Sequence, residues 1–309
     1  MATTTNVTST YQGEFAGKYI ASALLSANTI DKSGITVMPN VKYKAVVKKL
    51  AVSDVLADAD CDFQATSTVT LTERIIEPKA LKVNLQLCKA DYRSDWDAIS
   101  MGYSAFDELP KSFADFLIGH VSAKVSLKME QNIWSGDKNN AGEFDGLLTL
   151  LSTDADLPSA NEIASATVSA STIEAELGKI VDAIPSAIYG KEDLRIYISQ
   201  AMHKAYVRAL GSAGYLDRYA NQDLGTELMF DGIKLFVANG LVGAQAIATT
   251  VDNIFFGCGL QNDENVVKLI DMEPTDGSEN VRLVMKMTGA VQYYNVEEIV
   301  TYGVTNSAN

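Results

Sequence analysis

The chain has 309 residues, of which 47 % are hydrophobic and 21 % are charged, so it can bury a core and is not expected to be disordered. At about 100–200 residues per domain, this length suggests two domains or one elongated subunit of several lobes. The formal net charge of −14 argues against tight nucleic-acid binding, which needs clustered Lys and Arg. A surface that only faces a polyanion stays compatible with this charge, because repulsion keeps the two from sticking.

The cysteines and histidines are few and far apart. The chain has three cysteines, Cys61, Cys88 and Cys258, no CxxC, and two histidines, His120 and His203. A disulfide framework and a zinc site are therefore not expected, and folding in a reducing cytoplasm fits. No apolar run approaches the roughly 18 residues of a membrane span, and the N-terminus lacks the regions of a secretory signal.

The front of the chain predicts an arm followed by a long hairpin. Residues 1–10 are threonine-rich and polar, which favours a flexible arm. Apolar side chains alternate with polar ones from Val41 and again from Leu81 to Leu87, on both sides of an acidic tip. Such period-two patterning predicts a β-hairpin or ribbon. Because two strands alone are barely stable in water, we expect the ribbon to lie on its own subunit or on a neighbouring copy of the chain.

Residues 112–134 predict the longest helix. Pro110 suits its entry turn and Gly136 follows its end. At about 1.5 Å per residue the helix spans roughly 35 Å, a length that suits a strut. His120 is expected in a core or interface. The apolar i+4 row is Phe113, Leu117, Val121, Val125, Met129 and Ile133, and Phe116, His120, Ala123 and Leu127 are expected to support it.

The second half of the chain mixes helix and strand patterns. Ser171 and Glu174 predict a capping box that begins a helix, and Ser199 predicts the cap of another. Asp231-Gly232 is typical of a hairpin turn. This stretch predicts a compact α+β lobe. The C-terminal part is strand-rich, with candidates at 254–256, 266–270, 281–287 and 291–294 and a turn at Asp276-Gly277.

Three stretches approach known binding motifs and then depart from them. Residues 13–18 are one residue short of a P-loop, and Tyr19 replaces the magnesium-binding hydroxyl. Residues 58–62 suggest a calcium loop, but Phe63 and Val69 occupy the places of its glycine and bidentate glutamate. A solvated acidic tip is favoured there, with weak calcium binding as the alternative. Residues 257–259 lack the third glycine of GxGxxG, so close packing or a bulge explains them better.

No other catalytic pattern is present. The sequence contains neither a nucleophile elbow nor HExxH. Having only two histidines argues against most acid–base mechanisms, although carboxylates are numerous. We therefore predict no enzyme activity, no catalytic, cofactor-binding or metal-binding residue, and no cofactor.

The order of parts resembles the tailed-bacteriophage major capsid proteins with the Hong Kong 97-type fold. A polar arm, a two-stranded excursion, a strut helix, an α+β lobe and a returning strand-rich segment follow one another as in that family. Residues 72–85 resemble the return strand of the family's extended loop. Residues 130–137 with 146–148 resemble its spine-helix exit, and residues 253–260 with 281–287 and 290–294 resemble its closing strands.

The resemblance implies an α+β capsid fold. Residues 1–40 would be the N-terminal arm, and 41–81 the extended β-ribbon loop. Residues 82–151 and 251–309 would form the peripheral domain, with the spine helix at 112–134, and 152–250 the α+β axial domain. Pentamers and hexamers would build an icosahedral shell around double-stranded DNA, in a virion assembled in the host bacterial cytoplasm and without a membrane.

The resemblance also implies partners. Only a short arm precedes the ribbon, so a scaffolding protein would be separate, with portal and decoration proteins as further partners. No lysine matches a crosslinking motif, and none is assigned that role. The expected assembly contacts are Val47, Asp54, Asp58, Asp60, Asp62, Thr68, Glu73 and Arg74.

Two alternatives stay open. An encapsulin-type compartment would share the fold and hold a cargo enzyme instead of a genome. A monomeric, carboxylate-based hydrolase is the alternative from another class, although the missing motifs argue against it. Neighbouring genes would distinguish a phage capsid from an encapsulin-type compartment. A sizing column would distinguish a shell protein from a small enzyme.

Overall fold

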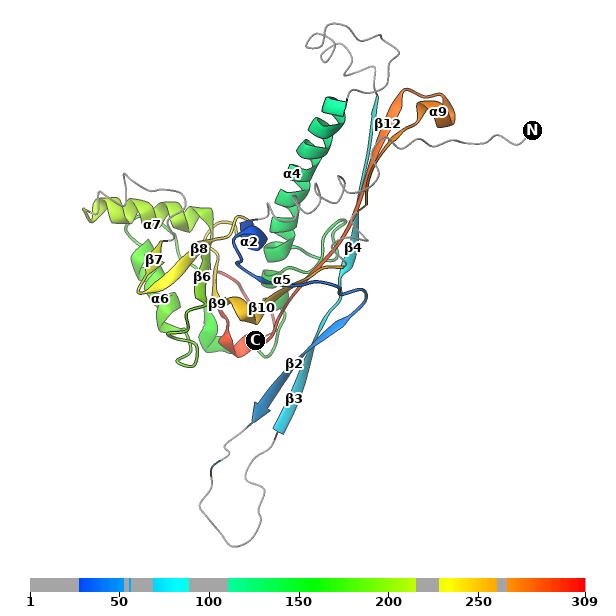
Figure 1. Ribbon diagram of the computed structural model, residues 1–309. Helices are drawn as coiled ribbons and strands as arrows, with labels where there is room; N and C mark the ends of the chain where they lie inside the picture. The colour runs from blue at the N-terminus through cyan, green and yellow to red at the C-terminus, as the bar shows by residue number, and fades with distance from the viewer. Residues whose placement is uncertain are drawn as a thin grey trace, which may run out of the picture.

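The computed structural model describes residues 28–52, 56, 69–88, 111–214, 228–259 and 266–308. The predicted arm, the near-P-loop stretch and all four aspartates of the acidic tip lie outside these residues. The described part mixes helices with three sheets, so the predicted α+β class is confirmed. Figure 1 shows a body from which one hairpin projects at one end, while the long helix and a narrow sheet extend toward the other.

The long helix α4 spans Lys111–Ser135, close to the predicted bounds. Val121, Met129 and Ile133 of the expected apolar row are buried. The supporting row was wrong, because His120, Ala123 and Leu127 are exposed. Both flanks of the row carry apolar residues, so periodicity does not say which flank the sheet covers. The buried flank instead carries Ile118, Ser122, Ser126, Glu130 and Trp134.

A five-stranded sheet lies against α4. Its central strand, β12, runs without interruption over Asn280–Tyr293, so the two separate strands predicted at 281–287 and 291–294 are one. The predicted turn Asp276-Gly277 is present, with Gly277 at φ 71°. The other strands are β1 (Thr36–Met38), β10 (Ile254–Gly257), β11 (Val266–Asp271) and β4 (Lys79–Cys88), and the short helix α9 (Glu273–Asp276) precedes the turn.

The hairpin is shorter than its pattern suggested. Strands β2 (Ala45–Val52) and β3 (Val69–Ile76) pair with each other from Ala45↔Ile76 to Val52↔Val69. Strand β4, whose alternation seemed to continue the ribbon, pairs with β12 instead, in ten residue pairs. The reason is that one alternating pattern serves both a free ribbon and a sheet with one buried face.

The remaining elements form a second lobe around a six-stranded sheet of order β5-β13-β9-β6-β8-β7. Ser199 caps α7 as predicted, its hydroxyl accepting from Met202 N. Asp231-Gly232 is the β7–β8 turn, as predicted. The predicted capping box was wrong, since Thr172 is the N-cap residue of α6. The bounds are β5 Glu162–Ile163, α6 Ile173–Asp182, β6 Leu194–Ile198, α7 Gln200–Ser212, β7 Met229–Phe230, β8 Ile233–Val237, β9 Ala246–Thr250 and β13 Val300–Tyr302.

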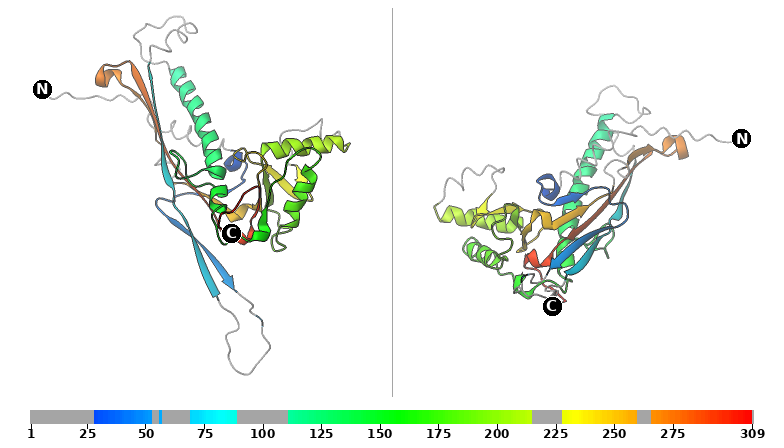
Figure 2. Two further views of the ribbon diagram at one scale, coloured as in Figure 1. Left: turned by 180° about the vertical axis from the view of Figure 1, so that it is seen from behind. Right: turned by 60° about the horizontal axis from the view of Figure 1, so that its bottom comes forward.

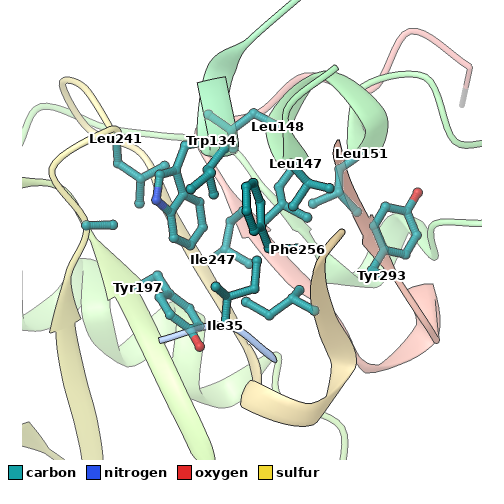
Figure 3. Packing of buried hydrophobic residues seen from close by; sticks show 14 of the residues in the cluster. Ile35, Trp134, Leu147, Leu148, Leu151, Tyr197, Leu241, Ile247, Phe256 and Tyr293 are labelled. Carbon is teal, nitrogen blue, oxygen red and sulfur yellow. The ribbon is translucent and has the colours of Figure 1, made fainter. Parts of the chain in front are cut away.

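The largest buried cluster joins the two sheets and the end of α4. Trp134, Tyr197 and Phe256 are each at most 1 % exposed, and Figure 3 shows them with Leu147 and Ile247. The Glu130 carboxylate is buried beside them and accepts from Thr29 N at 3.1 Å and Trp134 Nε1 at 3.3 Å. The short elements around this core are α2 (Asn28–Asp31), α5 (Leu147–Leu151) and the 3₁₀ turns Ser159–Asn161, Val251–Asn253 and Val296–Glu298.

Candidate assembly surface

The pairing register of the hairpin sorts its side chains into two faces. Residues directly opposite each other in an antiparallel pair lie on one face, and faces alternate along each strand. The inner face, toward the body, carries Ala45, Val47 and Lys49 of β2 opposite Ile76, Arg74 and Thr72 of β3. The outer face carries Val46, Lys48 and Leu50 opposite Ile75, Glu73 and Leu71.

The root of the inner face is packed into the body. Ile76 is 1 % exposed and lies against Gly257 at the end of β10. A Cβ on Gly257 would approach Ile76 Cγ2 to 2.7 Å. Only glycine therefore lets strands β10 and β3 come this close. Close packing, predicted as one explanation of the Gly257-Cys258-Gly259 stretch, is confirmed at its first glycine.

Two residues before Ile76 along β3, an ion pair and an aromatic ring hold Arg74 against the body. Arg74 donates to Asp154 Oδ2 at 2.7 Å, and its guanidinium lies 4.4 Å from the centre of the Tyr293 ring. The Tyr293 hydroxyl donates to the same carboxylate. Burial raises the pKa of Asp154, but the hydrogen bonds from Tyr293 and the Asp156 backbone, together with Arg74, more than offset it. The pKa of Asp154 therefore lies below its ordinary 3.8.

Lys49 makes the outermost contact between the inner face and the body. Its ammonium donates to Asn295 Oδ1 at 2.7 Å and to Glu297 Oε2 at 3.0 Å. Glu297 is 65 % exposed, so this ion pair is screened by solvent and contributes little stability. The hairpin is thus firmly held at Ile76 and Arg74 and only weakly held beyond them.

Replacing Asp154 with asparagine is expected to loosen the root of the hairpin. A depressed carboxyl pKa stabilises the fold above the ordinary value of 3.8, and this contribution disappears as the pH falls through the lower folded-state pKa. At neutral pH, amide hydrogen exchange in β3 should be roughly tenfold faster in Asp154→Asn, since a charged hydrogen bond is lost. Only the wild-type chain should lose protection on acidification. Equal profiles for both proteins would contradict the role of this contact.

The outer face of the hairpin is apolar and open. Val46 is 45 %, Leu50 59 %, Leu71 54 % and Ile75 50 % exposed. Lys48 and Glu73 form one ion pair among them at 3.4 Å. We call Val46, Leu50, Leu71 and Ile75 the outer apolar face. An exposed apolar surface of this kind is a candidate site of interaction with another molecule.

The expected assembly residues fall in three places. Val47 and Arg74 lie on the inner face, where Arg74 contacts its own chain, and Glu73 lies on the outer face. Asp54, Asp58, Asp60, Asp62 and Thr68 are outside the described residues. Sequence reasoning missed the outer apolar face, although adjacent apolar residues such as Val46 and Val47 signalled that both faces of β2 are in part apolar.

The described residues outside the hairpin show little that could perform chemistry. Within the described ranges, no group of three His, Cys, Asp or Glu side chains is placed to hold a metal ion. Likewise, none of the described helices is long and apolar enough to traverse a bilayer. His120 is exposed in the single subunit, so it is not a core residue, and its expected place in an interface between subunits stays a prediction. His203 is half-buried on α7, and burial lowers its pKa.

Comparison with known proteins places the fold. No family model and no curated protein matches the sequence. The capsid of a native GTA particle matches the structure with a TM-score of 0.58 and 12 % identity, over 99 % of this chain and 95 % of that chain. A structure from Mycobacterium phage Adephagia matches with a TM-score of 0.57 and 15 % identity, over 94 % and 90 % of the two chains. The chain has the Hong Kong 97-type capsid fold.

A particle of another kind is also similar in structure. A virus-like particle from Pyrococcus furiosus matches with a TM-score of 0.52 and 12 % identity, over 93 % of this chain and 97 % of that chain. The GTA match is described as a capsid, and the Pyrococcus furiosus match as a virus-like particle. Identities this low carry the fold alone.

Proposed function

We propose that this chain is the major capsid protein of a tailed phage, a structural subunit that assembles as pentamers and hexamers into an icosahedral shell around double-stranded DNA. The outer apolar face carries the proposal. A hairpin firmly held only at its root exposes the large apolar side chains of its outer face, and a second copy lying against them removes that area from water. Repeated contacts of this heterologous kind close into rings, and rings tile into shells.

The other parts of the proposal follow the fold. We propose the extended loop, peripheral and axial domains with the boundaries that the sequence suggested, and a separate scaffolding protein, a portal and decoration proteins as partners. The net charge of −14 supports a wall that confines DNA without binding its sequence, because like charges keep the genome from adhering.

Leu71→Glu is expected to abolish particle formation. The new carboxylate would have to be buried without a partner in every subunit contact, which costs several kcal/mol per contact. Thr72→Glu is the matched control, because Thr72 is the next residue of the same strand, on the inner face and opposite Lys49. Negative-stain microscopy and a sizing column would compare the two variants. Normal shells from Leu71→Glu would remove the outer apolar face from assembly.

A compartment that holds a cargo enzyme is the second candidate, favoured by the match to the Pyrococcus furiosus particle. The contents of purified particles separate the candidates. Nuclease-protected double-stranded DNA supports the phage capsid, whereas a co-purifying enzyme inside DNA-free particles supports the compartment. A small, particle-free species with hydrolase activity would favour the monomeric enzyme instead.

A further inference from the structure

One side of the sheet formed by β4, β12 and β11 is basic, although the chain as a whole is acidic. The opposite side packs on α4, where Ile118 and Val121 contact Val267, Leu283 and Met285. Strand alternation therefore turns the even-numbered residues of these three strands away from the helix. Four of them are cations, Lys82, Lys268, Arg282 and Lys286, and we call them the basic face.

None of the even-numbered residues on this side of the three strands is acidic. Those other than the four cations are polar or apolar, and Gln86 accepts from Arg282 Nε at 3.0 Å. Lys82, Arg282 and Lys286 are exposed and Lys268 is partly buried. Among the described residues, no salt bridge joins these four cations to a carboxylate. Asp276, in the turn beyond the sheet, is close enough for Arg282 to help the Ser278 hydroxyl lower its pKa.

The register of the sheet places two of the cations directly opposite each other. Lys82 of β4 faces Lys286 of β12. Like charges at directly opposed positions destabilise an antiparallel pair, so this arrangement is unfavourable for the isolated subunit. A bound anion removes the repulsion, which is a reason for such a pair on an otherwise acidic protein.

We infer that the basic face binds the acidic segment of residues 54–62 of a second copy of this chain. This inference rests on the proposed function. Residues 53–68 contain four aspartates, Asp54, Asp58, Asp60 and Asp62, and neither Lys nor Arg, which complements the four cations of the basic face. Electrostatic complementarity of this kind selects the partner and fixes its register.

The arrangement of the subunit favours contact between copies. Strands β2 and β3, which lead to this segment, point away from the body in the direction opposite to the far end of β12 (Figure 1 and Figure 2). Strands that lead to the acidic segment at one end and a basic face toward the other favour a head-to-tail contact, the kind that closes into rings when the rotation fits. The contact therefore joins two neighbouring subunits of one ring.

Charge exchange tests this pairing. The basic-face variant is Lys82→Glu with Lys286→Glu, and the segment variant is Asp58→Lys with Asp60→Lys. Each alone should lower the yield of particles by about tenfold or more, since opposed like charges replace attraction. The combined variant should restore the yield to within about threefold of wild type, because the reversed charges attract again.

Matched controls separate this pairing from general effects of charge. Lys204→Glu with Arg208→Glu reverses two exposed cations on α7 and should leave the yield unchanged. Wild-type assembly should also weaken between 0.05 and 0.5 M NaCl, since screening at about 0.1 M already acts over roughly 10 Å. Monodisperse subunits with unchanged thermal unfolding confirm that each variant folds.

The outcomes distinguish this inference from the proposed function. If wild type forms shells and the combined variant does not recover, the pairing is wrong while the capsid function stands. If the basic-face variant assembles normally but loses binding to a labelled double-stranded oligonucleotide, the face binds nucleic acid and the inference is overturned. If wild type forms no particles under any condition, the proposed function fails first.

Discussion

Trp134→Ala is expected to lower the free energy of unfolding of the free subunit by about 3–5 kcal/mol, the usual cost of emptying a buried aromatic site. The indole is fully buried, and its ring centre lies 5.1 Å from that of Tyr197. Its Nε1 donates to Thr29 Oγ1 at 2.9 Å. The variant therefore loses packing between the two sheets and the hydrogen bond that links α4 to α2.

Urea unfolding of unassembled subunits, followed by fluorescence and circular dichroism, measures this effect. Domain stabilities are typically about 5–15 kcal/mol, so the loss is a large fraction of the total. Leu127→Ala is the matched control, because Leu127 lies on the same helix and is 51 % exposed. It should change the unfolding free energy by less than about 0.5 kcal/mol. Equal effects of both variants would contradict the placement of Trp134 in the core.

Gly240→Ala is expected to destabilise the subunit severely, although it adds one methyl group. A Cβ at this position would lie 2.2 Å from the backbone oxygen of Glu130 and 2.6 Å from Trp134 Cδ1. The closer atom belongs to helix backbone and cannot rotate away, so α4 or the loop after β8 must move. Overpacking a core typically costs about 1–3 kcal/mol, and a clash with backbone lies at or above that range.

The matched control is Gly178→Ala in α6. A Cβ there meets no atom within 4 Å, so the substitution should be neutral or should stabilise the helix by up to about 1 kcal/mol. Thermal unfolding of the two variants side by side checks the prediction. A Gly240→Ala protein that melts like wild type would show that the backbone contact with Glu130 does not constrain this site.

Local signals predicted the elements that depend on local chemistry. The N-cap Ser199 and the turn Asp231-Gly232 lie where the sequence put them, because side-chain capping and positive φ values are set within a few residues. The long helix was also found, since its apolar row persists over many turns. The prediction of which flank of the apolar row is buried was wrong. Glu130 looks like a solvent-facing residue in the sequence, because its hydrogen-bond donors, Thr29 N and Trp134 Nε1, are known only from the structure.

Features that depend on distant partners could not be read from the sequence. The pattern of β4 does not say that it pairs with β12 instead of β2. The continuity of β12 through Gly289 was also missed. A Cβ on Gly289 would meet Met129 and Phe144 at 3.1 Å, so this glycine lets the strand pass close to the core, between the two strands that the sequence predicted as separate. The outer apolar face could be recognised only from the pairing register of β2 and β3.

The link between the hairpin and the body has a mechanical consequence. Strand β3 continues almost directly into β4, which pairs with β12 over ten residues. Hydrogen bonds of an antiparallel pair stand perpendicular to the strands, so a pull along the hairpin loads these ten positions in shear and at the same time. A tensile load from an adjoining subunit thus meets the stiffest direction of the sheet, whereas a sideways load would peel the pairs apart one by one.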